Sequence, residues 1–528
     1  MTTVLDAKGF PRVTYAAAPN LDPLHDMLDA QLPVFRASLL GKRWPNIIGG
    51  AQDFGGAPFA CASPLDSSVE LGTYATADAA TVARAVAAAR AGFEVWGALP
   101  WQERLAAIRR IARAMDDARH EMAMALILEV GKTRGEALGE AEEALALVEY
   151  YADQLEKNRG FASPAWTSAD GRETAQTVLR PLGVFGVISP FNYPMALAVN
   201  MVTAALTAGN TVVLKPTPNG ALVAGMLAQV MQRADLPAGV FNMVYGFDAG
   251  RYLADSEGVD GIAITGSYEA GMDILRKFAA GPYMRPVLAE LGGKNHAYID
   301  ASADVAMAVE GVARSAFGMQ GQRCTACSVA MVHESIYDRF ASELTQRAAR
   351  VRFGDTTKRD VTNGPLIDAR AFKRYEDAVA HAHEVGRVLA GGRRASGEGL
   401  DRGYFVEPTI VEGLPEGDWL LRKEHFVPLV ALVKFSDLDE ALQRGGSTNF
   451  GLTAGFYGSD KSAIDKFLHK AQAGVLYVNR LTGATNGAWP GIQSFCGWKG
   501  SGITGKGALG PHYLPQFMRE QSRTVRET

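Results

Sequence analysis

From about residue 76 to about residue 157, apolar side chains recur every three or four positions among Ala, Glu and Arg residues. The stretch AATVARAVAAARAGFEVW gives an example, because Val82, Val86, Ala89, Phe93 and Trp96 follow this spacing. Apolar residues at such intervals line one face of an α-helix and pack on a core. Several amphipathic helices are therefore predicted here.

Residues 184–291 follow another pattern, in which short β-rich apolar runs alternate with helical stretches. The runs are VFGVISP (184–190), TVVL (211–214), FNMVYG (241–246), GIAIT (261–265) and VLAEL (287–291). Strands and helices that alternate at this spacing predict a parallel sheet with helices on both faces. Open sheets of this kind bind ligands at the carboxyl ends of their strands.

A second alternating block extends from about residue 294 to residue 474. It contains a predicted helix at 304–317, a strand SVAMVHE at 328–334 and a further helix after Ser335. The tail after residue 474 is rich in Gly and Pro and has few periodic segments. Two α/β blocks in series predict two domains with a cleft between them.

Composition narrows the function classes. The chain has 528 residues and a formal net charge of −4, so no basic field attracts nucleic acid or anionic lipid. The chain contains no run of about 18 apolar residues, which a membrane-spanning helix would need. The opening MTTVLDAKGFPRVTY lacks signal-peptide features, and four cysteines are too few for a disulfide scaffold. A cytoplasmic protein is expected.

Two glycine-containing stretches could contact phosphate. GSGITG (500–505) fits the GxGxxG pattern, but it has no strand before it and no helix after it, so it is interpreted as a glycine-rich loop. In ITGSYEAG (264–271) a β-rich run ends at Gly266 and Ser267, where a helix begins and favours an anion. Lys215 closes a strand at the same expected sheet edge. An ordinary helix cap remains the alternative for Ser267.

The run GMQGQRCTACS (318–328) holds a Cys-x-x-C pair. Zinc would need further ligands that the spacing does not supply, and a redox dithiol would follow a strand and begin a helix. The pair therefore favours one reactive thiol, Cys324, with Cys327 as a small residue entering a strand. Glu290 ends an apolar strand, where burial would raise the pKa of a general base, although a structurally paired glutamate is the alternative. These residues alone indicate a nucleotide-dependent α/β enzyme with a cysteine nucleophile.

Taken in order, the motifs SPFNYP, KPTP, ITGSYEAG, ELGGKN, GQRCT, EHFVP and NRLTGA…FCGWKGSG resemble the aldehyde dehydrogenase superfamily over nearly the whole chain. The resemblance implies an α/β fold of two Rossmann-like parallel-sheet domains with a small β oligomerisation extension. Residues 1–293 would form a helical region and the NAD(P)-binding domain, with an oligomerisation strand near 160–183. Residues 294–475 would form the catalytic domain, and 476–528 would return to the cofactor domain and the oligomerisation region.

The resemblance also implies NAD(P)-dependent oxidation of an aldehyde to a carboxylate. Cys324 would add to the carbonyl, Asn192 and the Cys324 amide would hold the oxyanion, and Glu290 would activate the hydrolytic water. The cofactor is NAD or NADP, and no metal is implied. The residues that match family cofactor contacts are Ser189, Lys215, Gly266, Ser267, Glu424 and Phe426. A homo-oligomer, a dimer or larger, is expected.

Within the superfamily, EVGK, EYYADQ, GQRCTACS and the C-terminal motifs are most similar to the 1-pyrroline-5-carboxylate dehydrogenase group. That similarity implies proline catabolism, with L-glutamate γ-semialdehyde as substrate and Thr325, Gly483 and Ala484 around its α-carboxylate. Another semialdehyde, an aromatic aldehyde, a non-redox cysteine thioesterase and a non-catalytic binding protein are the alternatives. The chain departs from the family pattern at four places, which are Pro218, Val427, Cys496 and the longer stretch 485–495.

Overall fold

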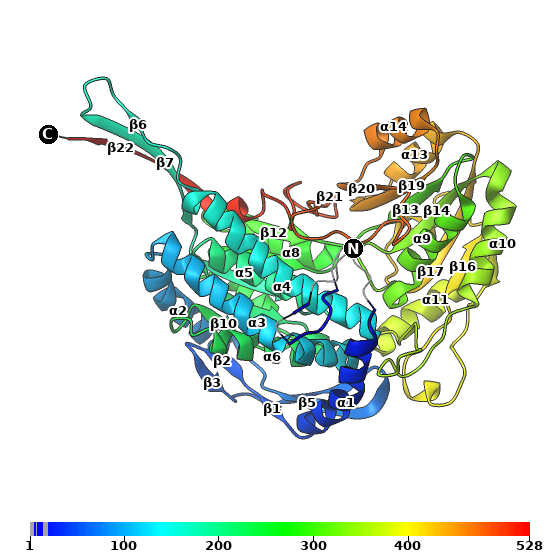
Figure 1. The fold of residues 1–528 in the computed structure, drawn as a ribbon, viewed down its shortest axis with the longest axis horizontal. Coiled ribbons are helices and arrows are strands. Elements are labelled where there is room, and N and C mark those ends of the chain that lie inside the picture. Colours follow the sequence, from blue (N-terminus) through cyan, green and yellow to red (C-terminus); the bar gives the residue numbers. More distant parts are fainter. Residues whose placement is uncertain (1–4, 7, 14–19, 528) are drawn as a thin grey trace.

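The computed structural model describes residues 5–6, 8–13 and 20–527, so parts of the opening stretch behind the cytoplasmic prediction lie outside the described residues. Two seven-stranded sheets organise the chain (Figure 1). In spatial order the first sheet consists of β12 (Val287–Glu290), β11 (Gly261–Thr265), β8 (Val184–Ser189), β9 (Thr211–Pro216), β10 (Phe241–Met243), β2 (Asn46–Ile48) and β3 (Ala51–Asp53). The first five strands are parallel, which confirms the sheet predicted over 184–291. The antiparallel β2 and β3 were not predicted.

Helices cover both faces of this sheet, because successive side chains of each buried strand point to opposite sides. On β8, Phe185 and Val187 pack in the core that α3 to α6 share, whereas Val184 packs with α2, α7 and α8. The helices are α2 (Ala79–Trp96), α3 (Trp101–Val130), α4 (Arg134–Lys157), α5 (Ala196–Thr207), α6 (Ala221–Arg233), α7 (Ala249–Asp255) and α8 (Tyr268–Ala279). All except α7 were predicted.

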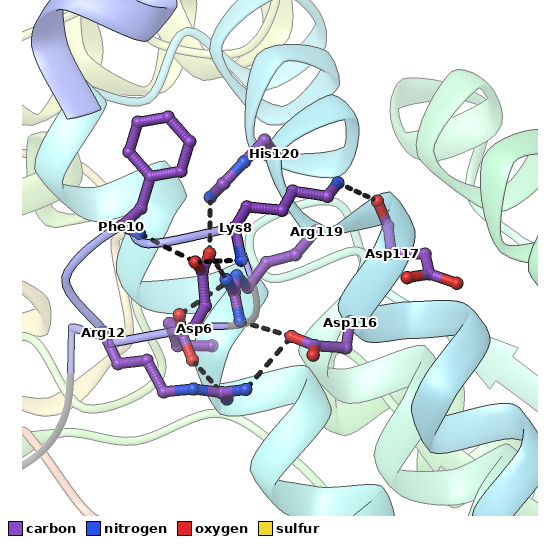
Figure 2. Close-up of polar contacts among 9 residues, drawn as sticks. Asp6, Lys8, Phe10, Arg12, Asp116, Asp117, Arg119 and His120 are labelled. Atoms are coloured by element: carbon purple, nitrogen blue, oxygen red, sulfur yellow. Dashed lines mark hydrogen bonds and ion pairs between the residues drawn. The ribbon is translucent and has the colours of Figure 1, made fainter. Parts of the chain in front are cut away.

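The N-terminal segment packs against this domain through α1 (Asp22–Leu39) and a small sheet of β1 (Arg43–Trp44), β5 (Asp66–Tyr74) and β4 (Phe59–Ser63). Ahead of α1, a buried ionic cluster fixes the chain to α3 (Figure 2). Arg119 pairs with Asp6 and, at 2.6 Å, with Asp116, which also lies 3.1 Å from Arg12. These charges compensate one another where water is excluded.

The second sheet lies in the other lobe of Figure 1. In spatial order it consists of β15 (Arg387–Ala390), β16 (Thr409–Glu412), β17 (Leu429–Phe435), β14 (Cys327–His333), β13 (Asn295–Ile299), β19 (Thr453–Tyr457) and β20 (Val475–Val478). Its helices are α9 (Val305–Phe317), α10 (Tyr337–Ala348), α11 (Ala369–Val385), α12 (Trp419–Arg422), α13 (Leu438–Gly446) and α14 (Lys461–Lys470). The predictions for 304–317 and 328–334 are confirmed, and β20 extends past residue 475, where the sequence put the end of this domain.

A long antiparallel arm projects from the first lobe and carries the C-terminal end of the chain (Figure 1). It consists of β6 (Trp166–Thr167), β7 (Glu173–Pro181) and β22 (Met518–Arg526). The pairing of β7 with β22 extends from Pro181 opposite Met518 to Glu173 opposite Arg526. Two further strands, β18 (Phe450–Gly451) and β21 (Trp498–Lys499), pair near the centre of the molecule. Within the described ranges, no helix combines the length and apolar character needed to cross a bilayer.

Candidate active site

The carboxyl ends of four neighbouring parallel strands bring most of the predicted cofactor residues to one edge of the first sheet. Ser189 ends β8, Lys215 lies at the end of β9, Gly266 and Ser267 follow β11, and Glu290 ends β12. The strand registers align these ends, with Ile188 opposite Lys215 and Thr265 opposite Glu290. Because β11 and β8 also pair in parallel, the residues share one edge.

Lys215 and Ser267 have the properties that a dinucleotide site needs. The Lys215 residue is 9% exposed, and burial lowers its pKa to about 8, opposed by Asp248. Its ammonium group forms no ion pair within the described part of the chain, so it can donate to a ligand. The Ser267 hydroxyl accepts from the Ala270 amide at 3.2 Å and caps α8, so the helix cap that the sequence left as an alternative is present.

The loop that carries Cys324 is held from behind by one side chain of β13. Asn295 Nδ2 donates to the Cys324 carbonyl at 2.7 Å and to the Ala326 carbonyl at 3.0 Å, while its Oδ1 accepts from the Thr453 amide at 3.0 Å. Cys327 begins β14 and is 1% exposed, as predicted for a small residue without chemistry. Asn295 was not singled out from the sequence, since only the folded loop brings it to Cys324.

Two consecutive glycines between β12 and β13 allow the catalytic loops to converge. A Cβ on Gly293 would lie 2.4 Å from the Cys324 carbonyl oxygen, and one on Gly292 would lie 2.3 Å from Glu424 Oε2. Glu424 Oε1 also accepts from the Gly293 amide at 2.9 Å. The ELGGKN motif therefore connects the nucleophile loop to the predicted cofactor contact Glu424, and only glycine permits this approach.

Desolvation raises the pKa of both the thiol and the candidate base, and each residue keeps part of its surface exposed. Burial, with the nearby carboxylates of Glu424 and Glu290, raises the pKa of the Cys324 thiol to about 12. Burial also raises the pKa of Glu290 well above its ordinary value, opposed by the Gly497 backbone, as expected from the sequence. Glu290 Oε2 has no hydrogen-bond partner among the described residues. An unsatisfied buried carboxyl oxygen beside a thiol is suited to accept a proton during a reaction.

Asn192 lies between two residues that contact the same loops. The ring of Phe191 packs edge-on against Phe426, with centroids 5.8 Å apart, and the guanidinium of Arg323 lies 5.8 Å from the Tyr193 ring. Asn192 itself is 3% exposed. Its flanking residues thus hold it beside the Cys324 loop on one side and the Phe426 loop on the other.

A C-terminal segment covers Glu290, and sequence reasoning missed this contact. Glu290 forms a β-bridge with Gly502, and the amide of the following Leu291 donates to the Ser501 carbonyl at 2.8 Å. Cys496, one of the departures from the family pattern, lies close enough for the Glu290 charge to raise its thiol pKa beyond the effect of burial. Residues 497–502, which include the start of the glycine-rich stretch, thus cover the candidate base.

The predicted carboxylate-binding residues meet beside the nucleophile loop, but the amide of one of them, Ala484, is already occupied. The Thr325 carbonyl accepts from the Thr485 hydroxyl at 2.7 Å, which fastens the 483–485 turn to the loop. The Ala484 amide donates to the Gly311 carbonyl at 2.9 Å, so the fold already uses this donor. Asn486 Nδ2 is buried without a partner among the described residues, and its Oδ1 would lie 1.8 Å from a Cβ on Gly483. A free donor therefore lies next to Gly483, although the sequence did not indicate Asn486.

Comparisons with known proteins agree with this architecture. A sequence profile of the aldehyde dehydrogenase family matches residues 53–522. The chain is 34% identical over 505 residues to a 1-pyrroline-5-carboxylate dehydrogenase of Bacillus mycoides (strain KBAB4), covering 93% of this chain and 94% of that protein. A Thermus 1-pyrroline-5-carboxylate dehydrogenase solved with bound NAD superposes with a TM-score of 0.92 and 28% identity, over 98% of this chain and 99% of that one. Proline utilization A from Bdellovibrio bacteriovorus superposes with a TM-score of 0.90 and 32% identity; the match covers 98% of this chain but spans about half, 53%, of that longer protein.

Proposed function

The chain belongs to the aldehyde dehydrogenase family, and we propose that this NAD(P)-dependent enzyme oxidises L-glutamate γ-semialdehyde to glutamate through a thioester on Cys324. The observation that carries the proposal is the convergence of a half-buried thiol, an unpartnered carboxyl oxygen among the described residues and a predicted dinucleotide edge in one site. The product assignment rests on the relatives named 1-pyrroline-5-carboxylate dehydrogenase. It gives the enzyme a place in proline catabolism.

In the first half of the reaction, the Cys324 sulfur adds to the aldehyde carbon as its S–H bond breaks, and the thiol proton is released to solvent as the first of the two protons of the turnover. Asn192 Nδ2 and the Cys324 amide donate to the resulting alkoxide, whose collapse expels hydride and forms a thioester. NAD(P), when bound, supplies the hydride acceptor. The Asn295 hydrogen bond to the Cys324 carbonyl fixes the loop, so that sulfur and amide keep their relative positions.

In the second half, water attacks the thioester carbon while Glu290 takes its proton. The C–S bond breaks, the acid leaves and the sulfur regains a proton. Each turnover consumes one aldehyde, one oxidised dinucleotide and one water, and it releases a carboxylate, a reduced dinucleotide and two protons. The raised pKa of Glu290 suits a base that must be reprotonated easily at neutral pH.

The residues at the first sheet edge fit the cofactor. The unpaired ammonium of Lys215 would donate to ribose hydroxyls, and the capped start of α8 at Ser267 would face the pyrophosphate. Glu424, held by the Gly293 amide, would bind the nicotinamide ribose, and Phe426 would pack beside the ring. Residue 218 is a proline rather than a carboxylate, so nothing at this position repels a 2′-phosphate and the cofactor is NAD or NADP.

For the substrate carboxylate, the proposed donors are the Thr325 hydroxyl, the Gly483 amide and, in place of the occupied Ala484 amide, Asn486 Nδ2. Another semialdehyde or an aromatic aldehyde is the competing assignment. A kinetic panel with glutamate γ-semialdehyde, succinate semialdehyde, aliphatic aldehydes and benzaldehyde, each with NAD and NADP, tests it. The proposal requires glutamate γ-semialdehyde to have the highest kcat/KM of the panel.

Two variants test the chemistry. Cys324→Ala is expected to abolish oxidation and to leave cofactor binding unchanged by titration calorimetry. Glu290→Gln is expected to produce one burst of reduced nicotinamide per active site and then to stall at deacylation. Absence of any absorbance change in the wild type, together with thioester hydrolysis, would instead identify a thioesterase. Normal steady-state turnover of the glutamine variant would remove Glu290 from the mechanism.

The organisation of the chain is proposed on similar grounds. Residues 1–293 would hold cofactor and residues 294–475 the nucleophile, while 476–528 returns to the first domain through β22.

The arm of β6, β7 and β22 exposes Trp166 and Val525, which are 57% and 60% exposed, and we assign it to contact with a second copy in a dimer or larger assembly. Deleting residues 518–528 and measuring mass by light scattering tests this role. The free cysteines suit a cytoplasmic location.

A further inference from the structure

A cavity of about 330 Å³ opens beside the nucleophile loop and is rich in arginine. It lies between α4, α9, α10 and the turn that precedes Gly483. The residues that determine its charge and position are Glu136, Arg314, Arg323, Arg347, Arg350 and Thr482. Arg323 directly precedes Cys324 and Thr482 directly precedes Gly483, so two lining residues belong to the loops that carry the nucleophile and the predicted carboxylate site.

The cavity carries a surplus of positive charge. Glu310 pairs with both Arg314 and Arg347, at 2.6 Å in each case, and Glu136 pairs with Arg323 at 3.1 Å. Arg350 makes no ion pair within the described ranges. Two of the four arginine charges are therefore uncompensated, which favours an anionic ligand in this space.

The Arg323 guanidinium has one hydrogen-bond donor without an acceptor among the described residues. Its Nη2 donates to Glu136, its guanidinium lies 5.8 Å from the Tyr193 ring centroid, and its Nε is buried without an acceptor in the described chain. The guanidinium lies against the Gly318 backbone, since its Nη2 would be in ordinary contact, at 3.6 Å, with a Cβ there. Arg323 therefore keeps hydrogen-bonding capacity that the described residues do not use.

We propose that this cavity is the entrance for the aldehyde and that Arg323 is a specificity-determining residue, whose guanidinium binds the carboxylate of an anionic semialdehyde together with the Thr325 and Gly483 donors. The inference rests on the proposed function, because it assigns the substrate class to the same site. Arg323 selects aliphatic aldehydes that carry a carboxylate a few methylenes from the carbonyl. Uncharged aldehydes of the same length reach Cys324 without this contact.

The test compares Arg323→Gln with wild type on two matched pairs of aldehydes. Succinate semialdehyde is paired with butanal, and glutamate γ-semialdehyde with pentanal. Loss of a charge-assisted hydrogen bond is expected to lower kcat/KM for the anionic members roughly 10- to 100-fold, mainly through KM, and to leave the neutral members within about twofold. Arg323→Lys is expected to restore part of the anionic activity. The matched control, Arg339→Gln, removes an exposed α10 arginine outside the cavity and is expected to change neither class.

A second variant keeps the proposal falsifiable if Arg323→Gln does not fold. Glu136→Gln keeps an acceptor for the Thr133 cap but removes the charge that competes for Arg323, so KM for anionic aldehydes is expected to fall while neutral aldehydes do not change. Equal losses for both classes in Arg323→Gln, or an unchanged KM for anionic aldehydes in both variants, would overturn the proposal. If wild type oxidises succinate semialdehyde in an Arg323-dependent way but not glutamate γ-semialdehyde, the inference stands and the proposed substrate falls. If glutamate γ-semialdehyde is oxidised equally well without Arg323, the proposed substrate stands and the inference about Arg323 falls.

Discussion

A buried ion pair behind Asn192 offers the sharpest test of how the fold holds the site. Lys132 Nζ lies 2.5 Å from Glu140 Oε2 with both side chains fully buried, and it sits 3.6 Å from the Tyr193 ring centroid. Glu140 Oε1 also accepts from the amides of Met195 and Ala196, at 2.9 and 3.1 Å, where α5 begins. One carboxylate therefore neutralises a buried ammonium and caps the helix that follows Asn192.

The perturbation is Glu140→Gln, which keeps the amide oxygen as a cap but removes the negative charge. Lys132 must then stay charged without its partner or give up its proton, and burial already lowers its pKa. Breaking a buried pair in this way costs about 3–5 kcal/mol, which corresponds to a melting temperature lower by roughly 10 °C. The double variant Lys132→Met/Glu140→Gln removes both charges and is expected to recover most of this loss.

The assay is a thermal melt followed by tryptophan fluorescence, combined with kcat/KM for the best aldehyde. Glu156→Gln on the same helix removes an exposed partner of Arg109, 3.3 Å away, and serves as the control with an expected cost below about 1 kcal/mol. If Glu140→Gln melts within about 2 °C of wild type, or if the double variant is less stable than the single one, the buried pair is not what holds the start of α5. In that case the position of Asn192 depends on packing alone.

Four further predictions follow from the site. Deacylation needs the carboxylate form of Glu290, and burial raises the pKa of that group above 4.5. The kcat should therefore rise with pH along an acid limb well above pH 4.5. A flat pH profile would show that another group is the base. Because the pKa of Cys324 is about 12, iodoacetamide labelling without cofactor should accelerate about tenfold per pH unit between about pH 7 and 9, and a plateau would contradict the buried neutral thiol. Gly483→Ala places a Cβ 1.8 Å from Asn486 Oδ1, so it should lower kcat/KM at least about tenfold without changing the cofactor Kd. Adding Asn486→Ser to this variant should restore part of the loss. If activity does not recover, the clash with Asn486 is disproved. Pro218→Glu should raise KM for NADP about tenfold relative to NAD, and an unchanged ratio would show that residue 218 does not face the 2′-phosphate.

Local patterns were sufficient for the elements that each segment stabilises by itself. The parallel strands over 184–291 read as continuous apolar runs because both their faces are buried, and Ser267 caps a helix through its own neighbours. Once the sheet is parallel, residues that end its strands must share an edge, so Lys215, Ser267 and Glu290 could be grouped in advance. The short β2 and β3 carry no such pattern, and their place is set by antiparallel pairing at the β10 edge of the sheet.

The sequence by itself determined the two α/β blocks, the carboxyl-edge site and, through resemblance, the chemistry of Cys324. Tertiary structure alone decided that Asn295 fixes the nucleophile loop, that residues 497–502 cover Glu290, and that the Ala484 amide is already used by Gly311. It also decided the charge of the cavity around Arg323. The physical reason is that periodicity and capping act over a few residues, whereas hydrogen bonds and desolvation between distant segments depend on which surfaces the packed core brings together.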